Sequence, residues 1–260
     1  AIAASLLGLI EPGDEAVMIE PLYDSYLPML ERAGGIPKLV RVEPPKWELP
    51  YRELEKAFSS NTKLLILNTP MNPSAKVFSR EELEFIASLL EKYDAYAICD
   101  EVYEHLVYDG NTHIPLMTLP GMRDRCIRIS SAGKTFSMTG WKVGYSVGSP
   151  ALITAVARAH QFMTFTTAPN LQKAVAYGLG KDEDYFRGLG SEMQARRDRL
   201  AGGLEEIGFE VLDGQGTYFL TADYRPFDFT GNDVDFCKYL TVEAGVAAVH
   251  IEDQICQKRC

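Results

Sequence analysis

Six polar residues in this 260-residue chain follow short apolar runs and have side chains suited to chemistry on a bound small molecule. A lysine amine can act as a nucleophile or carry a proton, and an aspartate carboxylate can hold a cationic group. Asparagine, tyrosine and serine can donate hydrogen bonds to anionic oxygens. The six residues are Asn68 and Asn72, Asp100 and Tyr103, and Ser131 and Lys134.

Each of these residues also has an ordinary structural explanation. An asparagine before a proline, such as Asn72, is usually part of a turn. An aspartate that closes a strand, such as Asp100, usually caps the next helix. However, the three apolar runs are expected to be parallel strands, whose carboxyl ends meet at the edge of a sheet where ligands bind. Three polar clusters at one edge favour a functional site.

The sequence Gly133-Lys134-Thr135 is also similar to part of a nucleotide-binding P-loop. That motif requires a glycine five positions before Gly133, where this chain has Arg128. The glycine-rich cradle of backbone amides is missing as well. The sequence therefore argues against a P-loop.

Strand-like apolar runs alternate with helical patterns in the first part of the chain. The run at 64–67 is typical of a strand covered on both faces. Ser79 and Glu82 form a capping-box pattern in front of an amphipathic helix. We therefore predict an α/β fold, a mainly parallel sheet with helices on both faces. The expected strands are residues 16–19, 38–42, 64–67, 96–99, 127–129 and 143–147.

The pattern changes near residue 184, where a long charged helix begins. Helices mixed with antiparallel-looking strands follow, an order that indicates a separate α+β unit. We predict a large domain over residues 1–183 and an incomplete small domain over residues 184–260. Helices at 151–162 and 172–179 are expected at the end of the large domain. In the small domain we expect helices at 185–207 and 232–244 and strands at 209–212 and 218–222.

Composition argues against several classes of protein. With 46% hydrophobic and 24% charged residues, the chain resembles a soluble globular enzyme. Its net charge of −10 argues against nucleic-acid binding, which needs clustered lysine and arginine. No apolar run approaches the about 20 residues that span a bilayer, so no membrane association is expected.

The five cysteines predict no metal site. Cys99 and Cys126 lie in apolar runs and are expected to be buried thiols in a reducing compartment, which favours the cytoplasm. Cys256 and Cys260 do not have the spacing of a zinc site, and no nearby pair supplies other ligands.

Three stretches around the six polar residues resemble the fold-type-I, class I and II aminotransferases. They are Asn-Thr-Pro-Met-Asn-Pro (68–73), Asp-Glu-Val-Tyr (100–103) and Ser-Ala-Gly-Lys-Thr-Phe-Ser-Met-Thr-Gly-Trp-Lys-Val-Gly (131–144). Within this family the chain is most similar to kynurenine aminotransferase/cysteine-S-conjugate β-lyase. The stretches at 20–26, 159–162 and 216–219 fit the same subgroup.

The resemblance implies pyridoxal 5'-phosphate as cofactor. Lys134 would carry it covalently and later move a proton between substrate and cofactor. Asp100 would pair with the protonated pyridine nitrogen, so that the ring can accept electrons. The other cofactor-binding residues implied are Asn72 and Tyr103 at the ring's 3-oxygen, Tyr23 on the ring face, and Ser131 and Lys142 at the phosphate.

The resemblance also implies an amino acid and a 2-oxo acid as substrates. Asn68 would help to hold the substrate carboxylate. Phe165 would reach the substrate pocket of a neighbouring subunit in a homodimer. Taken alone, Tyr23 is better explained as a core aromatic residue, and Lys142 can be explained as a surface lysine.

The sequence departs from the family pattern at both ends, so we expect a fragment. The family's phosphate-binding turn would precede Ala1, and its carboxylate-binding arginine would follow a stretch like 243–249. Residues 250–260 match no expected pattern. Ala75 stands where the family usually has glycine, and an alanine fits if the turn keeps a negative φ.

Three functions remain open at this stage. The first is transamination of an aromatic, kynurenine-like or sulfur-containing amino acid with a 2-oxo acid. The second is a catalytically inactive chain that keeps the fold and a dimer surface, because both ends depart from the family. The third is a cysteine-S-conjugate β-lyase, since the same lysine and aspartate serve both reactions.

Overall fold

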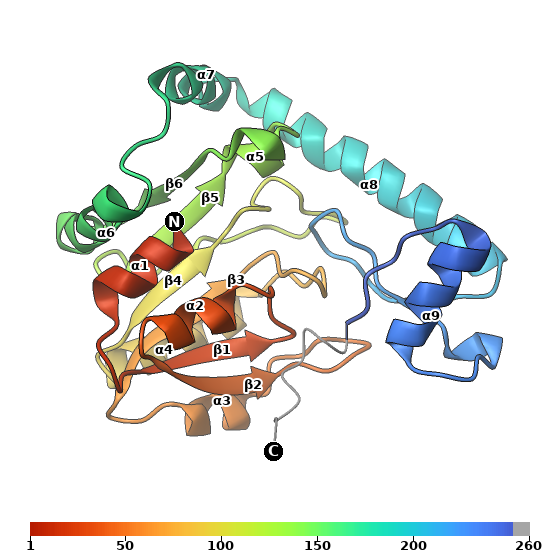
Figure 1. The fold of residues 1–260 in the computed structure, drawn as a ribbon, viewed down its shortest axis with the longest axis horizontal. Helices are drawn as coiled ribbons and strands as arrows, with labels where there is room; N and C mark the ends of the chain where they lie inside the picture. Colours follow the sequence, from red (N-terminus) through yellow and green to blue (C-terminus); the bar gives the residue numbers. More distant parts are fainter. Residues whose placement is uncertain (252–260) are drawn as a thin grey trace.

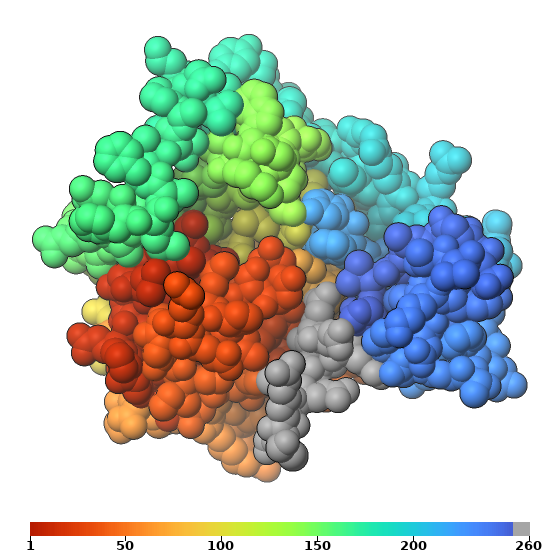
Figure 2. Space-filling view, viewed as in Figure 1, coloured from red at the N-terminus to blue at the C-terminus, as the bar shows by residue number. Residues whose placement is uncertain are grey.

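The structure, a computed structural model, describes residues 1–251 (Figure 1 and Figure 2). A large sheet with its helices forms one part of the molecule. The long helix α8 (Glu183–Glu206) leads from it to a smaller part that contains α9 (Asp233–Tyr239). The unusual sequence that begins near residue 250 falls almost wholly on residues 252–260, outside the described residues. The domain boundary near residue 184 stays a prediction.

Six strands form the large sheet, in the order β2-β1-β3-β4-β5-β6. All neighbouring strands are parallel except β6, which pairs with β5 in the antiparallel direction. The mainly parallel α/β sheet is therefore confirmed, and each predicted strand is present near its expected position. The strands are β1 (Glu15–Glu20), β2 (Ile36–Arg41), β3 (Thr62–Asn68), β4 (Tyr96–Asp100), β5 (Cys126–Ser131) and β6 (Gly144–Val147).

Helices cover both faces of this sheet, and those that build the core are α1 (Ile2–Leu9), α2 (Tyr26–Arg32), α3 (Tyr51–Ala57), α4 (Arg80–Lys92) and α6 (Pro150–Met163). On one face, α1, α2 and α6 bury strand residues such as Met18 and Ile66. On the other face, α3 and α4 bury Val17 and Leu65. Because successive strand residues point to opposite faces, one apolar run serves both layers. Each such side chain contributes about 1.5–3 kcal/mol when fully buried.

The second half of the chain differs from prediction in two places. The strand expected at 218–222 is reduced to β8 (Ala222–Asp223), which pairs with β7 (Glu210–Val211). Just before this segment, the Thr217 amide donates a hydrogen bond to the carbonyl of Leu106, outside any strand. The helix expected at 232–244 is α-helical only to Tyr239 and then forms a π-helical turn, Leu240–Ala244.

The remaining helical elements are short or lie at the edge of the molecule. Within residues 1–251, none of the helices combines the length and the apolar content needed to cross a membrane. These elements are α5 (Ala132–Thr135), α7 (Pro169–Leu179) and the 3₁₀ turns Leu116–Thr118, Thr139–Trp141 and Arg225–Phe227.

The segment that precedes β8 is bound to the loops at the carboxyl edge of the large sheet. Arg197 on α8 donates hydrogen bonds to both carboxylate oxygens of Asp109, at 2.7 and 2.9 Å, and to the carbonyl of Gly214, at 2.6 Å. The amide of Gln215 donates to the carbonyl of Ala75 at 3.0 Å. These contacts bring the chain that follows residue 215 to the strand ends of the large sheet.

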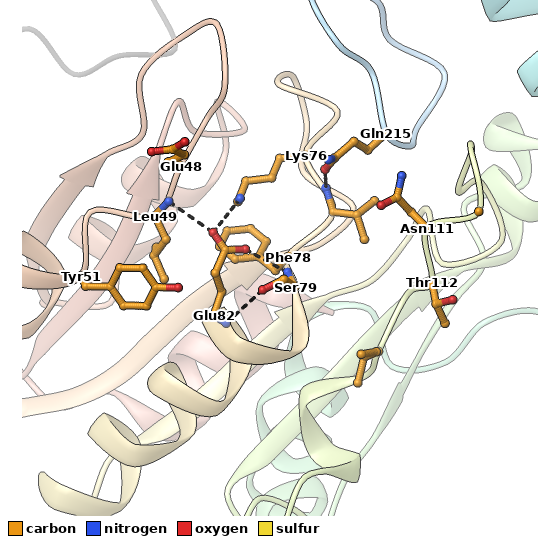
Figure 3. A pocket seen from close by; sticks show the side chains of 13 residues that line it. Glu48, Leu49, Tyr51, Lys76, Phe78, Ser79, Glu82, Asn111, Thr112 and Gln215 are labelled. Carbon is orange, nitrogen blue, oxygen red and sulfur yellow. Dashed lines mark hydrogen bonds and ion pairs between the residues drawn. The ribbon is translucent and has the colours of Figure 1, made fainter.

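The start of α4 is anchored by Glu82 (Figure 3). The Ser79 hydroxyl accepts a hydrogen bond from the Glu82 amide at 3.2 Å, and the Glu82 carboxylate accepts one from the Ser79 amide at 2.9 Å. The predicted capping box is therefore confirmed. The second oxygen of Glu82 accepts hydrogen bonds from the Lys76 amine at 2.7 Å and from the Leu49 amide at 3.2 Å.

Ala75, in the turn before this helix, has a φ of 58° and therefore lies in the left-handed region. The condition under which an alanine fits this turn, a negative φ, is therefore not met. The left-handed conformation costs an alanine about 1–2 kcal/mol. It is held because the Ala75 amide donates to the carbonyl of Met71 at 2.8 Å and its own carbonyl accepts from Gln215, while the methyl group is buried.

We expect Ser79→Ala to lower the free energy of unfolding by about 1 kcal/mol, because the Glu82 amide loses its acceptor. Urea unfolding at neutral pH measures the change. Ser88→Ala in the same helix is the control, since Ser88 is exposed and only bonds the carbonyl of Phe85. The control should change stability by less than about 0.5 kcal/mol. Equal effects of the two substitutions would contradict the prediction.

Candidate active site

The three polar clusters lie at one edge of the large sheet. β3, β4 and β5 are neighbours and run parallel, so their carboxyl ends are adjacent. Asn68 at the end of β3 is paired with Asp100 at the end of β4, and Asp100 with Ile129 on β5. Lys134 lies in α5, which follows β5 directly. The structure therefore brings together the strand ends that the sequence predicted to meet.

Asp100 is a buried carboxylate held on one side only. It is 5% exposed, and its Oδ2 accepts a hydrogen bond from the Tyr26 hydroxyl at 2.6 Å. Its Oδ1 is also buried but has no hydrogen-bond partner. Burial raises the pKa of Asp100, and the hydrogen bond from Tyr26 opposes that rise. A buried oxygen without a donor is unusual and indicates a place for a further donor.

Asn68 and Asn72 shape the loop beside Asp100. The Asn68 side-chain amide donates to the backbone carbonyl of Asp100 at 2.9 Å. Its side-chain oxygen accepts a hydrogen bond from the backbone amide of Asn72 at 2.7 Å. The Thr69 amide donates to the same Asp100 carbonyl at 3.1 Å. Asn68 thus fixes the loop from within, and the Asn72 side chain is carried on a well-bonded turn.

The Lys134 amine lies among aromatic side chains. Its Nζ donates a hydrogen bond to the Tyr218 hydroxyl at 2.5 Å and lies 5.7 Å from the ring centre of Tyr103. Tyr103 is buried and packs edge-on against Tyr218 with ring centres 5.2 Å apart. Burial, followed by hydrogen bonding with Tyr218, raises the pKa of the Tyr103 phenol. Tyr103 therefore keeps its proton and remains a hydrogen-bond donor.

Ser131 and Lys142 frame the turn around α5. Ser131 precedes α5 and pairs with Gly144 of β6, and Lys142 lies just before that strand. Gly133 packs tightly between them, because a Cβ there would lie 2.9 Å from the Thr139 Cα. This close approach requires glycine at position 133 and brings the Thr139–Lys142 turn against the start of α5.

Tyr23 and Phe165, like Lys142, are exposed members of the predicted set. Tyr23 is 43% exposed and packs edge-on against Tyr26, with ring centres 5.5 Å apart. It therefore lies next to Asp100 through Tyr26. Phe165 is 74% exposed in the turn between α6 and α7, and the structure does not bring it to the other site residues within this chain.

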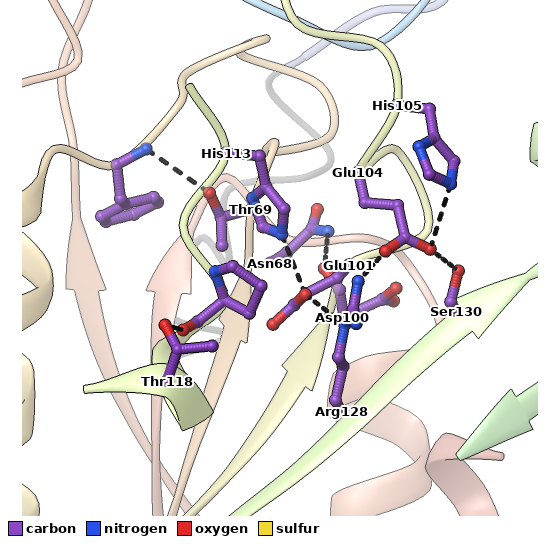
Figure 4. A network of polar contacts seen from close by, with 12 residues as sticks. Asn68, Thr69, Asp100, Glu101, Glu104, His105, His113, Thr118, Arg128 and Ser130 are labelled. Carbon is purple, nitrogen blue, oxygen red and sulfur yellow. Dashed lines mark hydrogen bonds and ion pairs between the residues drawn. The ribbon is translucent and has the colours of Figure 1, made fainter. Parts of the chain in front are cut away.

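A buried network of charged side chains adjoins the site (Figure 4). Glu101 is fully buried, and its Oε2 accepts a hydrogen bond from Arg128 Nε at 2.6 Å and lies 2.8 Å from His113 Nε2. Arg128 also forms a close ion pair with Glu104. Glu104 in turn accepts a hydrogen bond from the Ser130 hydroxyl at 2.5 Å.

This network connects the turn that carries Tyr103 to the strand that leads to Lys134. Glu101 and Glu104 lie on either side of Tyr103 in sequence, and Arg128 on β5 binds both carboxylates. An arginine side chain can bind two carboxylates at once because its guanidinium is a rigid fork of donors. Arg128 therefore holds the relative position of β4 and β5 at the point where the site is built.

Sequence reasoning missed Tyr26, Tyr218 and Arg128 as parts of this arrangement. Tyr26 lies in the Tyr-Asp-Ser-Tyr stretch, one helical turn after Tyr23, and this spacing was an available signal. Arg128 is a charged residue inside an otherwise apolar strand, a pattern that indicates a buried ion pair. Tyr218 lies in the stretch 216–219 that fits the family, but its contact with Lys134 spans 84 positions of sequence and was not assigned.

The residues at this edge fit pyridoxal phosphate. Asp100 Oδ1 lacks a hydrogen-bond donor, and a protonated ring nitrogen would supply one together with a compensating charge. The Lys134 amine is an appropriate nucleophile for an aldehyde. Ser131 and Lys142 provide a hydroxyl and a positive charge for a phosphate. Across residues 1–251, no group of three histidine, cysteine or acidic side chains could hold a metal ion.

Two cavities are lined by described residues. One lies away from the predicted site residues, and the other includes Tyr218, the partner of Lys134. A cavity of 710 Å³ next to α4 is lined by Tyr51, Lys76 and Glu82, among others, and by none of the predicted site residues (Figure 3). The amine of Lys76 there is already bound to Glu82. A smaller cavity of 220 Å³ includes Tyr218 in its wall. The predicted site residues therefore lie at the strand ends and not in the larger cavity.

Comparison with known proteins agrees with this geometry. The sequence model described as aminotransferase class I and II matches residues 1–260. The probable N-succinyldiaminopimelate aminotransferase DapC of Mycobacterium tuberculosis is 44% identical over 96% of this chain and 63% of its own length. Kynurenine–oxoglutarate transaminase 3 of Mus musculus is 40% identical over 95% of this chain and 60% of its own length. The methionine aminotransferase of Escherichia coli is 37% identical over 96% and 64%.

Solved structures show the same fold. The N-succinyldiaminopimelate aminotransferase from Mycobacterium tuberculosis matches with a TM-score of 0.96 and 42% identity, over 99% of this chain and 67% of that one. YbdL from Escherichia coli, described with a methionine aminotransferase function, matches with a TM-score of 0.94 and 36% identity, over 98% and 67%. The chain spans less than two thirds of the length of the three relatives described above.

We expect Arg128→Met to lower the free energy of unfolding by about 3 kcal/mol, because Glu101 and Glu104 would keep buried charges without their arginine partner. Chemical denaturation measures the loss. Arg125→Met is the matched control, since Arg125 binds the exposed carboxylate of Asp94. The control should cost less than about 1 kcal/mol. A loss no greater at Arg128 than at Arg125 would show that the network does not stabilise the fold.

Proposed function

The chain belongs to the class I and II aminotransferases, and we propose that it provides the catalytic site of an enzyme that moves an amino group from an amino acid to a 2-oxo acid. The observation that carries this proposal is the Lys134 amine beside Tyr103, at the sheet edge that also holds the buried carboxylate of Asp100. A lysine for covalent attachment and a carboxylate for a ring nitrogen are the groups that chemistry on pyridoxal phosphate requires.

Enzymes of this family use pyridoxal phosphate, which supplies an aldehyde for amines and a ring that accepts electrons from the substrate carbon. We propose that Lys134 Nζ binds the aldehyde carbon and that Asp100 Oδ1 accepts a hydrogen bond from the protonated ring nitrogen. Tyr103 and Asn72 donate hydrogen bonds to the ring's 3-oxygen. The raised pKa of Tyr103 supports this assignment, since its phenol keeps its proton.

The remaining cofactor contacts come from three side chains around the same edge. Tyr23 covers one face of the ring, where an aromatic side chain offers contact area at little entropic cost. Ser131 binds the phosphate through its hydroxyl, and Lys142 through its charge. Their places next to Tyr26 and around α5 support these roles.

Lys134 also moves the proton of the reaction. Its Nζ is bound to the Tyr218 hydroxyl at 2.5 Å and lies 5.1 Å from the ring centre of Tyr218 and 5.7 Å from that of Tyr103. Aromatic faces and a hydroxyl hold the free amine near the site and tolerate its protonated form. With the cofactor bound, the free Lys134 amine would take the proton from the substrate Cα and later release it.

For the amino donor we propose an aromatic, kynurenine-like or sulfur-containing amino acid, with a 2-oxo acid as acceptor. Relatives named as kynurenine–oxoglutarate transaminase and methionine aminotransferase support this class. Asn68 helps to hold the substrate carboxylate. Its hydrogen bonds to the Asp100 carbonyl and the Asn72 amide keep its side chain in one orientation beside the site.

We propose a homodimer in which the turn between α6 and α7 contacts the second copy, with Phe165 completing the substrate pocket of that copy. Phe162, Met163 and Phe165 are 88%, 48% and 74% exposed. A cluster of large apolar side chains on a surface is typical of a protein interface. Pairing of two copies through this turn would bury these side chains.

We also propose that the protein acts in the cytoplasm. Cys99 and Cys126 are free, buried thiols on neighbouring strands. Unpaired buried cysteines are typical of reducing compartments.

We expect borohydride reduction in the presence of pyridoxal phosphate to label Lys134, because its amine would carry the cofactor. Mass spectrometry of the digested chain locates the label, and an assay with an amino acid and a 2-oxo acid detects the new oxo acid. Lys134→Arg should remove the label and lower turnover at least about a hundredfold. Lys173→Arg, on the exposed surface of α7, should change neither. An unlabelled Lys134 would contradict the proposal.

We expect the unmodified chain to sediment as a dimer. Phe165→Asp should raise the dissociation constant of this dimer at least about tenfold, because a charge would enter the interface. Sedimentation velocity over a dilution series measures this. Ile207→Asp is the control, since Ile207 is 64% exposed but lies at the end of α8. A monomeric chain, or equal effects of the two substitutions, would argue against this surface.

A further inference from the structure

Tyr26 and Asp100 form a buried pair that neither the family resemblance nor the sequence pattern assigned. Tyr26 is the first residue of α2, and Asp100 is the last residue of β4. The two side chains are 3% and 5% exposed. The phenol oxygen lies 2.6 Å from Asp100 Oδ2, which is the distance of a strong hydrogen bond to a carboxylate.

The hydrogen bonding of this carboxylate is asymmetric. Oδ2 is held by the Tyr26 hydroxyl, whereas the buried Oδ1 has no partner. A carboxylate with a purely structural role is expected to have both oxygens satisfied. Here one oxygen is fixed, and the other is buried and left available.

Tyr26 is the donor in this pair. Burial raises the pKa of its phenol, and the neighbouring Asp100 carboxylate raises it further. The phenol therefore keeps its proton over the whole physiological range. A donor that never ionises provides a fixed dipole directed at Oδ2.

We propose that Tyr26 is a positioning residue for Asp100: its hydroxyl orients the carboxylate and keeps it ionised, so that Oδ1 can hold a proton on the ring nitrogen of the cofactor. This proposal rests on the proposed function, because it needs pyridoxal phosphate at Lys134. It adds a residue from α2 that acts through Asp100 and not on the cofactor itself.

The physical reason is a competition for one proton. Desolvation favours a protonated Asp100, and a carboxyl that takes the proton leaves the ring nitrogen neutral and the ring a poorer acceptor of electrons. The hydrogen bond from Tyr26 and the backbone amide of Val102 lower the pKa of Asp100. Glu101 raises it, and the amino group of Ala1 lowers it. Glu101 and the amino group of Ala1 are the same in every variant compared below. A difference in the titration midpoint of Asp100 therefore reports on Tyr26.

The first test uses the 260-residue chain without cofactor. Carbon-13 NMR of labelled aspartate carboxyls follows the titration of Asp100, and Asp100→Asn assigns its signal. We expect Tyr26→Phe to raise the midpoint by about one to two pH units, the value of a hydrogen bond to a charged group. Tyr93→Phe removes a hydroxyl near the opposite end of β4 and should leave the midpoint unchanged. An unchanged midpoint in Tyr26→Phe would overturn the proposal.

A second variant works in the opposite direction and preserves the packing. Replacing Tyr26 with 3-fluorotyrosine makes the phenol a stronger donor, and we expect the Asp100 midpoint to fall below that of the unmodified chain. A midpoint that moves up, or not at all, would contradict a hydrogen bond that tunes the carboxylate.

The last measurement separates this proposal from the proposed function. In the chain loaded with nitrogen-15-labelled cofactor, we expect the ring-nitrogen signal of Tyr26→Phe to move toward the value of an unprotonated pyridine, while borohydride still labels Lys134. An unmoved nitrogen signal with Lys134 labelled would overturn the role of Tyr26 alone. An unlabelled Lys134 in the unmodified chain would instead reject the proposed function, and the role of Tyr26 with it.

Discussion

The buried negative charge at the end of β4 is the constraint around which the candidate site is organised. A carboxylate removed from water needs donors, and Asp100 takes one from α2, through Tyr26. The backbone carbonyl of the same residue accepts hydrogen bonds from Asn68 and Thr69 on the neighbouring loop. The next residue, Glu101, is buried as well and is matched by Arg128 on β5. One strand end thus binds three other elements of the fold.

The apolar core makes this polar arrangement possible. The two faces of the sheet bury alternating residues of the same strands, so the strands cannot slide relative to each other without exposing them. A buried ion pair contributes little net stability by itself, because desolvation offsets most of the attraction. The network around Arg128 is therefore better understood as a device that fixes position, with the stability supplied by the core. Its value lies in the placement of Tyr103 and Lys134.

Sequence predicted the sheet because its signals are local: apolar runs, a capping box and polar residues at strand ends. It also identified the residues that meet at the sheet edge, since parallel strands bring their carboxyl ends together. It did not assign the Tyr26–Asp100 pair: the spacing of Tyr26 from Tyr23 hints at Tyr26, but its partner Asp100 lies 74 positions away and is reached only through the docking of α2. Arg128 entered the sequence analysis only as the residue that stands where a P-loop requires glycine. Sequence reasoning gave no sign of the positive φ at Ala75, which is held because the Ala75 amide donates to the Met71 carbonyl and the Ala75 carbonyl accepts from the Gln215 amide.

The contact of Tyr218 with Lys134 shows that the two halves of the chain form the site together. The segment after residue 213 reaches the sheet edge because Arg197 holds Gly214 and Asp109 at once. Gly216 is then packed so closely that a Cβ would lie 2.7 Å from the Leu106 carbonyl oxygen and 2.9 Å from Pro70. Only glycine permits that approach, and it brings Tyr218 over the amine. The position of Lys134 therefore depends on packing between loops far apart in sequence as well as on its own strand.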